Sequence, residues 1–472
     1  GIAVLAALCR KQLGAAMLLS TAAVLSVRHI RFQALFAVVL VIVGGAVLAS
    51  AWESLQKYIE GARIRTAIAA TAMLLTIALA GVRSFDLVTD RTYLGTTDLG
   101  SFGTGLSWWF PEGAAAFVER EKLPGRMFNS YNEGGYLTWR LGEHYQDYID
   151  GRAIPFGTHL FQRNGQLLGT LPDSPDWQNE AERYGINFIL VPLGRYNALQ
   201  FFPVLRQFCQ SDSWRPVYLD EVSAVFLRRT PQTENLMARL AIDCETAPIT
   251  PNLPNARDGN AFHRWANAAA VLQALGRNEE SLQATTKALG IFPDTAFVHF
   301  LRGNLLRDAR NIREAEEQYR LAASLEGNAA TWSALADLYQ AEGRREEEIH
   351  AREQAVALLA KPGVALLSLG YTYLDVRRPE DALHAFARAE SSVSPGQADA
   401  SYLANLAHGR ALAWMALGNL SRAISFEEET VRLTPDRIDD WLQLAEMYEH
   451  DQRTQDAQAA RNRAYSLRTR TP

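Results

Sequence analysis

The residues best suited to chemistry lie in one stretch of this 472-residue chain, RMFNSYNEGGYLTWRLGEHYQDYIDGR at positions 126–152. Four polar side chains there could bind a sugar or a phosphate through charge-assisted hydrogen bonds. They are Asn132, Glu133, Asp150 and Arg152. The same residue types also build ordinary structure, because a glutamate can cap a helix and an Asp-Gly-Arg sequence often forms a turn with a surface ion pair. We favour this structural role and keep a ligand pocket as the alternative.

The sequence lacks the signatures of several function classes. No signal marks the second acid of a glycosidase pair, and no GxSxG motif indicates a serine hydrolase. The cysteines Cys9, Cys209 and Cys244 form no CxxC motif or Cys/His cluster, so we expect no zinc site. A formal net charge of −5 argues against nucleic-acid binding, which requires a basic surface. We therefore predict no catalytic residue, no metal and no cofactor in this chain.

The sequence around the stretch predicts the elements that position it. Short apolar runs alternate with segments of helical spacing, a pattern typical of a small α/β layer domain, which we place at residues 92–230. Its helices are expected at Pro111–Glu121, Gly134–Leu141 and Trp177–Tyr184, and its strands at Met127–Phe128, Tyr148–Ile149, Asn187–Pro192, Trp214–Leu219 and Ser223–Arg229, the last two as a hairpin.

Residues 24–230 resemble a bacterial family. The order FPEGAAAFV, RMFNSYNEGGYLTWRL, DYIDGR, YGINFILVP and WRPVYLDEVSAVFLRR is similar to the soluble domain after the last membrane helices of a broad family of polytopic proteins. VLSVRHIRFQALFAVVL at residues 24–40 resembles the late membrane helices of that family. The family is similar to glycosyltransferases that use lipid-linked sugars, in the superfamily of the protein mannosyltransferases. Their catalytic acid lies in an early loop that nothing here matches, so the resemblance implies ancestry and membrane location but not activity.

Three apolar runs predict membrane helices within residues 1–91. Phe32–Trp52 holds 21 residues without a charge, enough to span a hydrocarbon core at about 1.5 Å per residue. Gln12–Val27 and Thr66–Val82 are shorter and have basic residues at their edges. Buried core helices are the alternative, because the two shorter runs are borderline in length. We predict about three transmembrane helices and contact with the lipid bilayer through residues 12–82.

The basic residues beside these runs do not decide the sidedness of the soluble part. Five of them fall on one side and four on the other. We place the chain in the bacterial cytoplasmic (inner) membrane and expect its soluble part to be extracytoplasmic, with the sidedness left open. The chain begins Gly-Ile-Ala-Val-Leu-Ala-Ala-Leu, without a methionine or a charged leader, so we expect a fragment that starts inside a hydrophobic helix.

Residues 259–472 carry a repeat of about 34 residues. One position recurs at spacings of 34, 33, 34, 41 and 34, as Ser281, Ala315, Glu348, Ala382, Ala423 and Ala457. Twelve residues before each of these the residue is small, and nine before it is mostly large and aromatic. Small residues let two helices approach, and a large side chain fills the space beside them. The region is identified as a member of the tetratricopeptide repeat (TPR) family, with six repeats in an all-α solenoid and one insertion near residues 396–401.

Such arrays present an inner groove, lined by the first helix of each repeat. By the repeat phase this surface is apolar with a few amide and basic donors, which suits an extended peptide or an amphipathic helix of a protein partner. Alternatively, the groove packs on the chain's own α/β domain or on a neighbouring subunit. The residues assigned to the inner groove are Phe297, Phe300, Asn304, Arg307, Val364, Leu367, Tyr371, Leu374, Asn405 and His408, the last expected to be a groove or core histidine.

A proline-containing segment at residues 231–258 is expected to be a linker with one helical stretch. It contains Cys244, which follows Cys209 by 35 residues. In an oxidising compartment these two cysteines could form a disulfide worth roughly 3–4 kcal/mol by loop entropy, whereas in the cytosol they would be ordinary thiols.

The sequence therefore predicts an α+β multidomain chain of membrane helices (1–91), an α/β domain (92–230), a linker (231–258) and a TPR superhelix (259–472). We interpret the chain as a membrane-anchored scaffold that binds a protein partner, as an accessory or assembly subunit of a membrane complex. The alternative is the C-terminal part of a membrane glycosyltransferase whose catalytic region lies upstream of residue 1. A third interpretation, an independent sugar-binding module, rests on the stretch at 126–152 alone.

Overall fold

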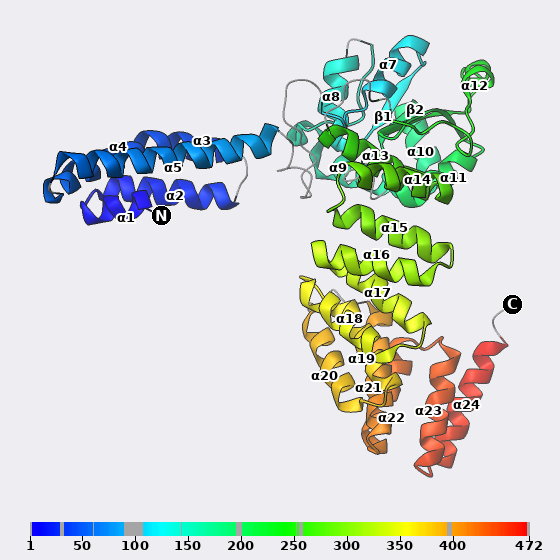
Figure 1. Ribbon diagram of the computed structural model, residues 1–472. Coiled ribbons are helices and arrows are strands. Elements are labelled where there is room, and N and C mark those ends of the chain that lie inside the picture. Colours follow the sequence, from blue (N-terminus) through cyan, green and yellow to red (C-terminus); the bar gives the residue numbers. More distant parts are fainter. Residues whose placement is uncertain are drawn as a thin grey trace. The chain divides into compact units, whose positions relative to one another are not determined.

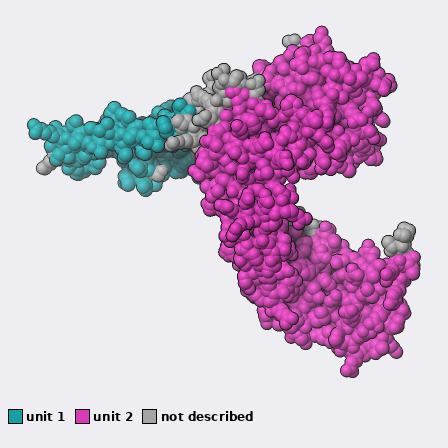
Figure 2. All heavy atoms as spheres, turned by 45° about the vertical axis from the view of Figure 1, so that its right-hand side comes forward, with its two compact units in different colours: residues 1–88 teal, residues 89–472 magenta. Residues whose placement is uncertain are grey.

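The computed structural model of the protein describes residues 2–28, 33–59, 61–88, 107–142, 144–194, 201–251, 253, 258–393 and 399–469. The chain divides into two compact units, Gly1–Val88 and Thr89–Pro472, which Figure 2 shows in different colours. Figure 1 gives the order of the elements along the chain. The predicted basic flanks at His29, Arg31 and Arg91 and part of the predicted insertion at 396–401 lie outside the described residues.

The first unit consists of apolar helices. Two segments are long and apolar enough to cross a membrane by length and composition, Leu35–Tyr58 with 24 residues and Ala62–Asp86 with 25. The prediction of a third is wrong within the described residues, because that run forms only the shorter apolar helix Leu13–Leu25. The elements are α1 (Ile2–Cys9), α2 (Leu13–Arg28), α3 (Gln33–Val39), the π-helical turn η2 (Leu40–Gly44), α4 (Gly45–Leu55), the 3-10 turn η3 (Gln56–Tyr58) and α5 (Ala62–Val88).

The second unit contains a four-stranded sheet in the order β1-β2-β4-β3. β1 (Arg126–Asn129) pairs in parallel with β2 (Ile186–Pro192). β4 (Ser223–Arg228) runs antiparallel to both β2 and β3 (Trp214–Leu219), so the last two strands form the predicted hairpin. These four strands lie where the sequence predicted strands.

Helices cover both faces of the sheet, which explains the continuous apolar run of β2. Phe188 and Leu190 pack into the core beside α7, α8 and α12. Ile189 and Val191, which point to the opposite face, pack into the core with α9, α10 and α11. The predicted α/β layer domain is therefore present. Its helices are α7 (Glu112–Glu121), α8 (Tyr131–Leu141), α9 (Ala153–Leu168), α10 (Pro175–Tyr184), α11 (Phe202–Gln210) and α12 (Glu234–Leu240).

The predicted strand at Tyr148–Ile149 is wrong. This segment has no regular structure, because its backbone groups bond to a side chain instead of to a neighbouring strand. The Tyr148 N–H donates to Oδ1 of Asn129 at 2.7 Å, and Nδ2 of Asn129 donates to the Ile149 carbonyl at 2.7 Å. Helices α9 and α11 were not predicted at all. α9 carries a kink at Gly157, whose φ of 71° is left-handed, and this kink breaks the helical signal in the sequence.

The first helix of the repeat region packs into the same core as the sheet. α13 (Asp258–Ala274) contributes Val271 and Leu272 to the cluster that holds Phe208 of α11 and Phe226 of β4. Figure 1 shows α13 and α14 beside α11. The α/β domain and the repeat region, which the sequence separates with a linker, are thus packed together.

Polar contacts fix the position of α13 on the sheet. Nδ2 of the buried Asn267 donates to the Leu193 carbonyl, which follows β2, at 3.0 Å, and also to the Glu221 carbonyl in the β3–β4 turn. Nε of Arg264 donates to the buried Glu221 carboxylate at 2.5 Å. Because these donors satisfy groups at strand ends, α13 is held in a defined register on the sheet.

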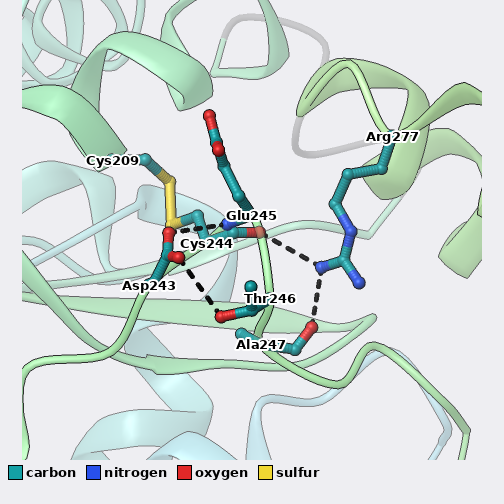
Figure 3. The surroundings of a disulfide bond; sticks show 7 residues. All are labelled: Cys209, Asp243, Cys244, Glu245, Thr246, Ala247 and Arg277. Atoms are coloured by element: carbon teal, nitrogen blue, oxygen red, sulfur yellow. Dashed lines mark hydrogen bonds between the residues drawn. A yellow bond between two sulfur atoms is a disulfide. The ribbon is translucent and has the colours of Figure 1, made fainter.

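A disulfide joins the linker to α11. Cys209 of α11 is bonded to Cys244, with a distance of 6.0 Å between their Cα atoms. Arg277, in the turn after α13, donates from Nη1 to the Cys244 carbonyl at 3.1 Å and to the Ala247 carbonyl at 2.7 Å (Figure 3). The linker segment around Cys244 is therefore held between the α/β domain and the first helix pair.

From α13 onward successive helices pack in pairs, α13 with α14, α15 with α16, and so on to α23 with α24. This is the helical hairpin arrangement of the TPR fold, and the number of six TPR repeats stays a prediction. The helices are α14 (Asn278–Ile291), α15 (Ala296–Asp308), α16 (Ile312–Leu325), α17 (Ala329–Ala341), α18 (Arg345–Leu358), α19 (Gly363–Asp375), α20 (Pro379–Ser391), α21 (Ala400–Ala416), α22 (Leu420–Leu433), α23 (Ile438–His450) and α24 (Thr454–Arg468).

The predicted small positions let the paired helices approach. A Cβ atom at Gly303 would lie 2.6 Å from the ring of Tyr319, and one at Gly370 would lie 2.4 Å from the ring of Phe386. Both rings come from the second helix of the pair and are fully buried. The space of the missing side chain is thus filled by an aromatic ring of the partner helix.

Candidate functional site

Asn129, which the sequence analysis did not single out, holds the stretch at 126–152 together. It ends β1, its side chain is fully buried, and its amide bonds to Tyr148 and Ile149 as described above. Its own carbonyl accepts from Nδ2 of Asn164 on α9 at 2.9 Å. One amide side chain therefore fixes the 146–152 segment against β1. The sequence signal for this role was an asparagine at the end of an apolar strand.

The residues of the predicted ligand pocket have different environments. Asn132 is exposed, whereas Glu133 is buried and its carboxylate accepts a hydrogen bond from the hydroxyl of Ser130, the N-cap residue three positions earlier, whose side chain bonds to no backbone N–H of α8. Asp150 is also buried and accepts from the backbone N–H of Arg152 at 2.8 Å and from its Nε at 2.8 Å. The Asp150–Arg152 contacts are those of a turn with an ion pair, whereas the capping role of Glu133 stays a prediction. The ligand pocket stays a prediction.

Close packing brings Glu133 and Asp150 to one place. A Cβ atom on Gly134 of α8 would lie 2.0 Å from the Ile149 carbonyl oxygen and 2.6 Å from the Asp150 Cα atom. The segment before Arg152 therefore touches the backbone of α8, and only a glycine fits at position 134.

The two carboxyl groups in this segment have opposite pKa shifts. Hydrogen bonds from Arg152 lower the pKa of Asp150, although burial opposes the effect. Burial, and next the negative charge of Asp150, raise the pKa of Asp147. The ionised form of Asp150 is thus stabilised by the neighbouring arginine, whereas the ionised form of Asp147 is destabilised by burial and by Asp150.

The structure divides the predicted inner-groove residues among three places. Those on α15 lie nearest the α/β domain, those on α19 in the middle, and those on α21 beside the last helix pair. At the first place, Phe297, Phe300 and Asn304 line an open hollow of about 470 Å³ together with Phe202 and Pro203 of α11. The α/β domain therefore forms one wall of the hollow at this end, and both interpretations of the inner groove stay predictions.

The middle of the groove is largely apolar. Leu367, Tyr371 and Leu374 on α19 are partly buried against the core of the α19–α20 pair. Val364, near the start of the same helix, exposes 73% of its surface. The remaining basic residue of the set, Arg307 on α15, donates to its neighbour Asp308. Val364 is thus the apolar groove residue most available to a partner.

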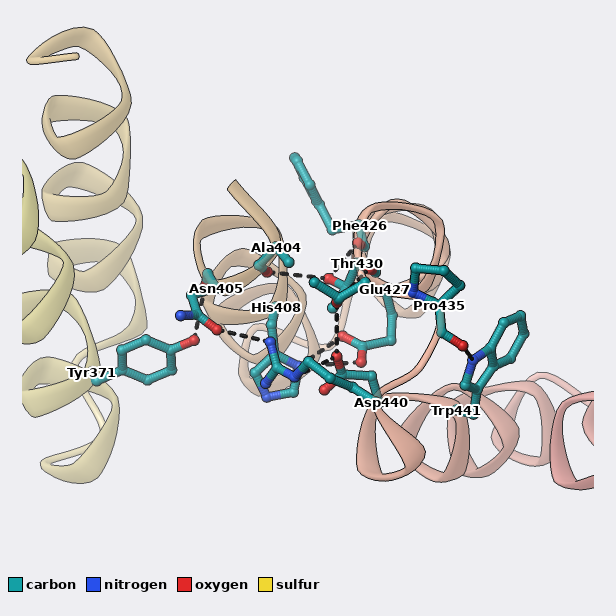
Figure 4. A network of polar contacts seen from close by, with 12 residues as sticks. Tyr371, Ala404, Asn405, His408, Phe426, Glu427, Thr430, Pro435, Asp440 and Trp441 are labelled. Carbon is teal, nitrogen blue, oxygen red and sulfur yellow. Dashed lines mark hydrogen bonds and ion pairs between the residues drawn. The ribbon is translucent and has the colours of Figure 1, made fainter. Parts of the chain in front are cut away.

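The α21 end of the groove is a polar network (Figure 4). The Tyr371 hydroxyl donates to the Asn405 carbonyl at 2.7 Å, and burial raises the pKa of Tyr371 to about 12. Nδ1 of His408 lies 3.0 Å from Oε2 of Glu427 on α22. Burial opposes protonation of His408, but the hydrogen bond and negative charge of Glu427 outweigh it and raise the His408 pKa.

A second set of residues joins three of the helix pairs to the pair before them. A tyrosine of the first helix donates to a glutamate of the preceding helix, and an arginine five residues later lies over the tyrosine ring. The sequence analysis assigned only the aromatic residues, and the arginines at fixed spacing were the missed signal. The sets are Tyr339, Glu316 and Arg344; Tyr373, Glu353 and Arg378; and Tyr448, Glu428 and Arg453.

Hollows occur at two of these joints in equivalent positions. One of about 500 Å³ is lined by Tyr339 and His350, and one of about 400 Å³ by Tyr373 and His384. The equivalent residues are 34 positions apart, which is the repeat length. Besides the inner groove, the array therefore presents a second hollowed surface that repeats with the helix pairs.

No protein-family model matches the chain, and no curated protein is similar to it at the significance required. Among solved structures it is similar to YrrB, described as a TPR protein with an unusual peptide-binding site, with 18% identity, a TM-score of 0.33, and coverage of 38% of this chain and 88% of YrrB. MamA has 19% identity, a TM-score of 0.32, and coverage of 35% and 94%. PilF of Pseudomonas aeruginosa has 16% identity, a TM-score of 0.34, and coverage of 43% and 90%.

Likenesses with TM-scores this low carry no argument about function. The TPR fold rests instead on the helix pairs and the glycine–aromatic contacts described above. The resemblance of residues 24–230 to the glycosyltransferase-like membrane family stays a prediction.

The substitution Asn129→Asp tests the structural role of the 126–152 stretch. It places an acceptor oxygen opposite the Ser130 and Ile149 carbonyls, which now accept from Nδ2. We expect the free energy of unfolding to fall by about 3 kcal/mol or more, because buried acceptors lose their donor and face a charge. The exposed Asn179→Asp on α10 is the control, with a change within about 0.5 kcal/mol. Urea unfolding of the full chain in detergent, followed by near-UV circular dichroism, measures both; equal effects would contradict the assignment.

Proposed function

We propose that this protein is a membrane-anchored TPR scaffold that binds a protein partner, as an accessory or assembly subunit of a membrane complex. The observation that carries the proposal is the array of helix pairs from α13 to α24. In such an array each pair contacts only its neighbours, so much of every pair remains available as surface. The inner groove, with the exposed Val364 near its middle, offers an apolar surface of the kind that takes up a peptide or a helix.

The membrane anchor is supported by the apolar helices of the first unit. On α5 the large apolar side chains of Met73, Leu74, Leu75, Ile77 and Leu79 are each more than half exposed. A continuous apolar surface of this kind is unfavourable in water and favourable in a hydrocarbon core. Leu35–Tyr58 and Ala62–Asp86 each have the length to cross such a core.

The extracytoplasmic placement of the soluble part is supported by the disulfide between Cys209 and Cys244. Disulfides persist in oxidising compartments and are rare in the cytosol. Here the bond also lies within the joint between the α/β domain and the first helix pair, so a reducing compartment would weaken that joint.

Counting reactive thiols tests this placement. The chain has three cysteines, of which Cys9 is free. If the soluble part folds outside the cytoplasm, a maleimide-polyethylene-glycol reagent added to the denatured, unreduced chain from native membranes attaches once. After reduction it attaches three times, with Cys9 as the internal control for labelling. Three attachments before reduction would place Cys209 and Cys244 in the cytoplasm.

Substitution of an inner-groove residue tests the scaffold role. Val364→Asp puts a charge on the exposed apolar position of α19, and we expect it to release the partner without changing the melting temperature. Leu321→Asp is the matched control, because Leu321 is 40% exposed but lies on α16, the second helix of its pair. Blue-native electrophoresis of membranes solubilised in mild detergent reports the mass of the assembly.

The expected result is a high-mass assembly for the natural chain and for Leu321→Asp, and a chain running alone for Val364→Asp. An assembly that survives Val364→Asp and is lost in Leu321→Asp would show that the partner binds the surface formed by the second helices of the pairs. A chain that runs alone in every case would contradict the scaffold role.

A further inference from the structure

Three side chains with metal-binding atoms meet where the α21–α22 pair joins α23. His408 comes from α21, Glu427 from α22 and Asp440 from α23, and one ligand atom of each lies within 4.8 Å of the other two. The His408 Nδ1 atom is 3.0 Å from the Glu427 carboxylate. Figure 4 shows the three side chains turned toward one another from three separate helices.

Both carboxylates are removed from water. Glu427 is 0% exposed and Asp440 is 2% exposed, whereas the His408 side chain keeps 19% of its surface accessible. Two carboxylates this close together in a buried place repel each other unless positive charge lies beside them. The His408 edge gives an ion a route to them.

Arg437 supplies part of that positive charge. Its Nε lies 3.1 Å from Oδ2 of Asp440, and its Nη1 donates to Oδ1 of Asn405 at 2.9 Å. The Arg437 side chain is 40% exposed, so it reaches the site from its rim. The hydrogen bonds of the Glu427 carboxylate, by contrast, go to His408. Arg437 thus pairs with one carboxylate and leaves the other facing the imidazole.

We propose that His408, Glu427 and Asp440 bind one divalent first-row transition-metal ion of the zinc class. An imidazole nitrogen and two carboxylate oxygens are zinc ligands, at about 2.0–2.2 Å from the ion. Tetrahedral ligands at that radius are about 3.4 Å apart, so ligand atoms already within 4.8 Å need small movements. Mg²⁺ and Ca²⁺ prefer sets made of oxygen alone, so the histidine favours zinc over them.

The site departs from the expectation of no metal and is independent of the scaffold role. A bound ion would join α21, α22 and α23 directly and hold the last helix pair on the one before it. Arg437 acts as a competitor, because its guanidinium pairs with the Asp440 carboxylate that the ion would also bind. The ion and Arg437 would therefore compete for the Asp440 carboxylate.

Titration of the metal-free full chain with ZnCl₂, measured by competition with a chromophoric chelator, tests the proposal. We expect one saturable site per chain. His408→Ala and Glu427→Gln should each weaken binding at least about tenfold, since even outer contacts of metal sites are worth about 10–100-fold. His384→Ala, which removes an exposed histidine of α20, should leave binding unchanged. Arg437→Gln should strengthen binding, because it removes the competing cation.

The direction of each change in zinc affinity distinguishes a metal site from an ordinary ion-pair network. A network without a metal would show no saturable zinc binding, or binding that persists in His408→Ala and Glu427→Gln, and either result overturns the proposal. Weaker binding in Arg437→Gln would also overturn it. Circular dichroism of each metal-free variant shows whether the helices are intact, and Glu427→Gln, which keeps the side-chain shape, remains informative if His408→Ala fails to fold.

Discussion

The packing of α13 on the sheet is the contact on which the second unit depends. Its residues Val271 and Leu272 share one apolar cluster with strand β4 and helix α11, and Asn267 bonds to carbonyls at the ends of the strands. This face of the sheet is apolar and must be buried, and so must the outer side of the first helix of the array. Packing α13 on the sheet buries both surfaces. The α/β domain therefore takes the place of the polar capping repeat that a solenoid otherwise requires at its end.

The rest of the array is built outward from α13 by repeated contacts. Three of the joints combine a buried tyrosine, a glutamate on the preceding helix and an arginine over the ring, and Gly303 and Gly370 receive aromatic rings of the partner helix. Stability in such an array is the sum of pairs and their joints. The joint at α21–α23 differs because a histidine and two buried carboxylates meet there, and this difference singles it out as a place where an ion could control the attachment of the last pair.

Much of this fold could be predicted from the sequence because it depends on periodicity. The recurrence of small and aromatic residues locates the helix pairs, and short apolar runs locate all four strands. The error at Tyr148–Ile149 has a physical reason, since the side chain of Asn129 takes the hydrogen bonds that a strand partner would have taken. The third apolar run is too short to count as a membrane helix once its helix bounds are known.

What could not be predicted depends on contacts between distant residues. The sequence of α13 has the pattern of an ordinary TPR helix, and nothing in that pattern shows that the helix also covers a sheet. His408, Glu427 and Asp440 are separated by 19 and 13 residues, which matches no metal-binding motif, and only the packing of three helices brings them together. The hollow at the first part of the inner groove has one wall from α11 of the α/β domain, and the sequence predicted a contact with that domain only as an alternative.

Native-state hydrogen exchange of the full chain in detergent, resolved by peptide, tests the central role of α13 most directly. If α13 completes the α/β core, its amides open with the same free energy as those of β2 and β4, and with a higher free energy than those of α23 and α24. If instead the amides of α13 exchange together with those of α15–α24 while the sheet remains protected, the array folds independently of the sheet and the account is wrong.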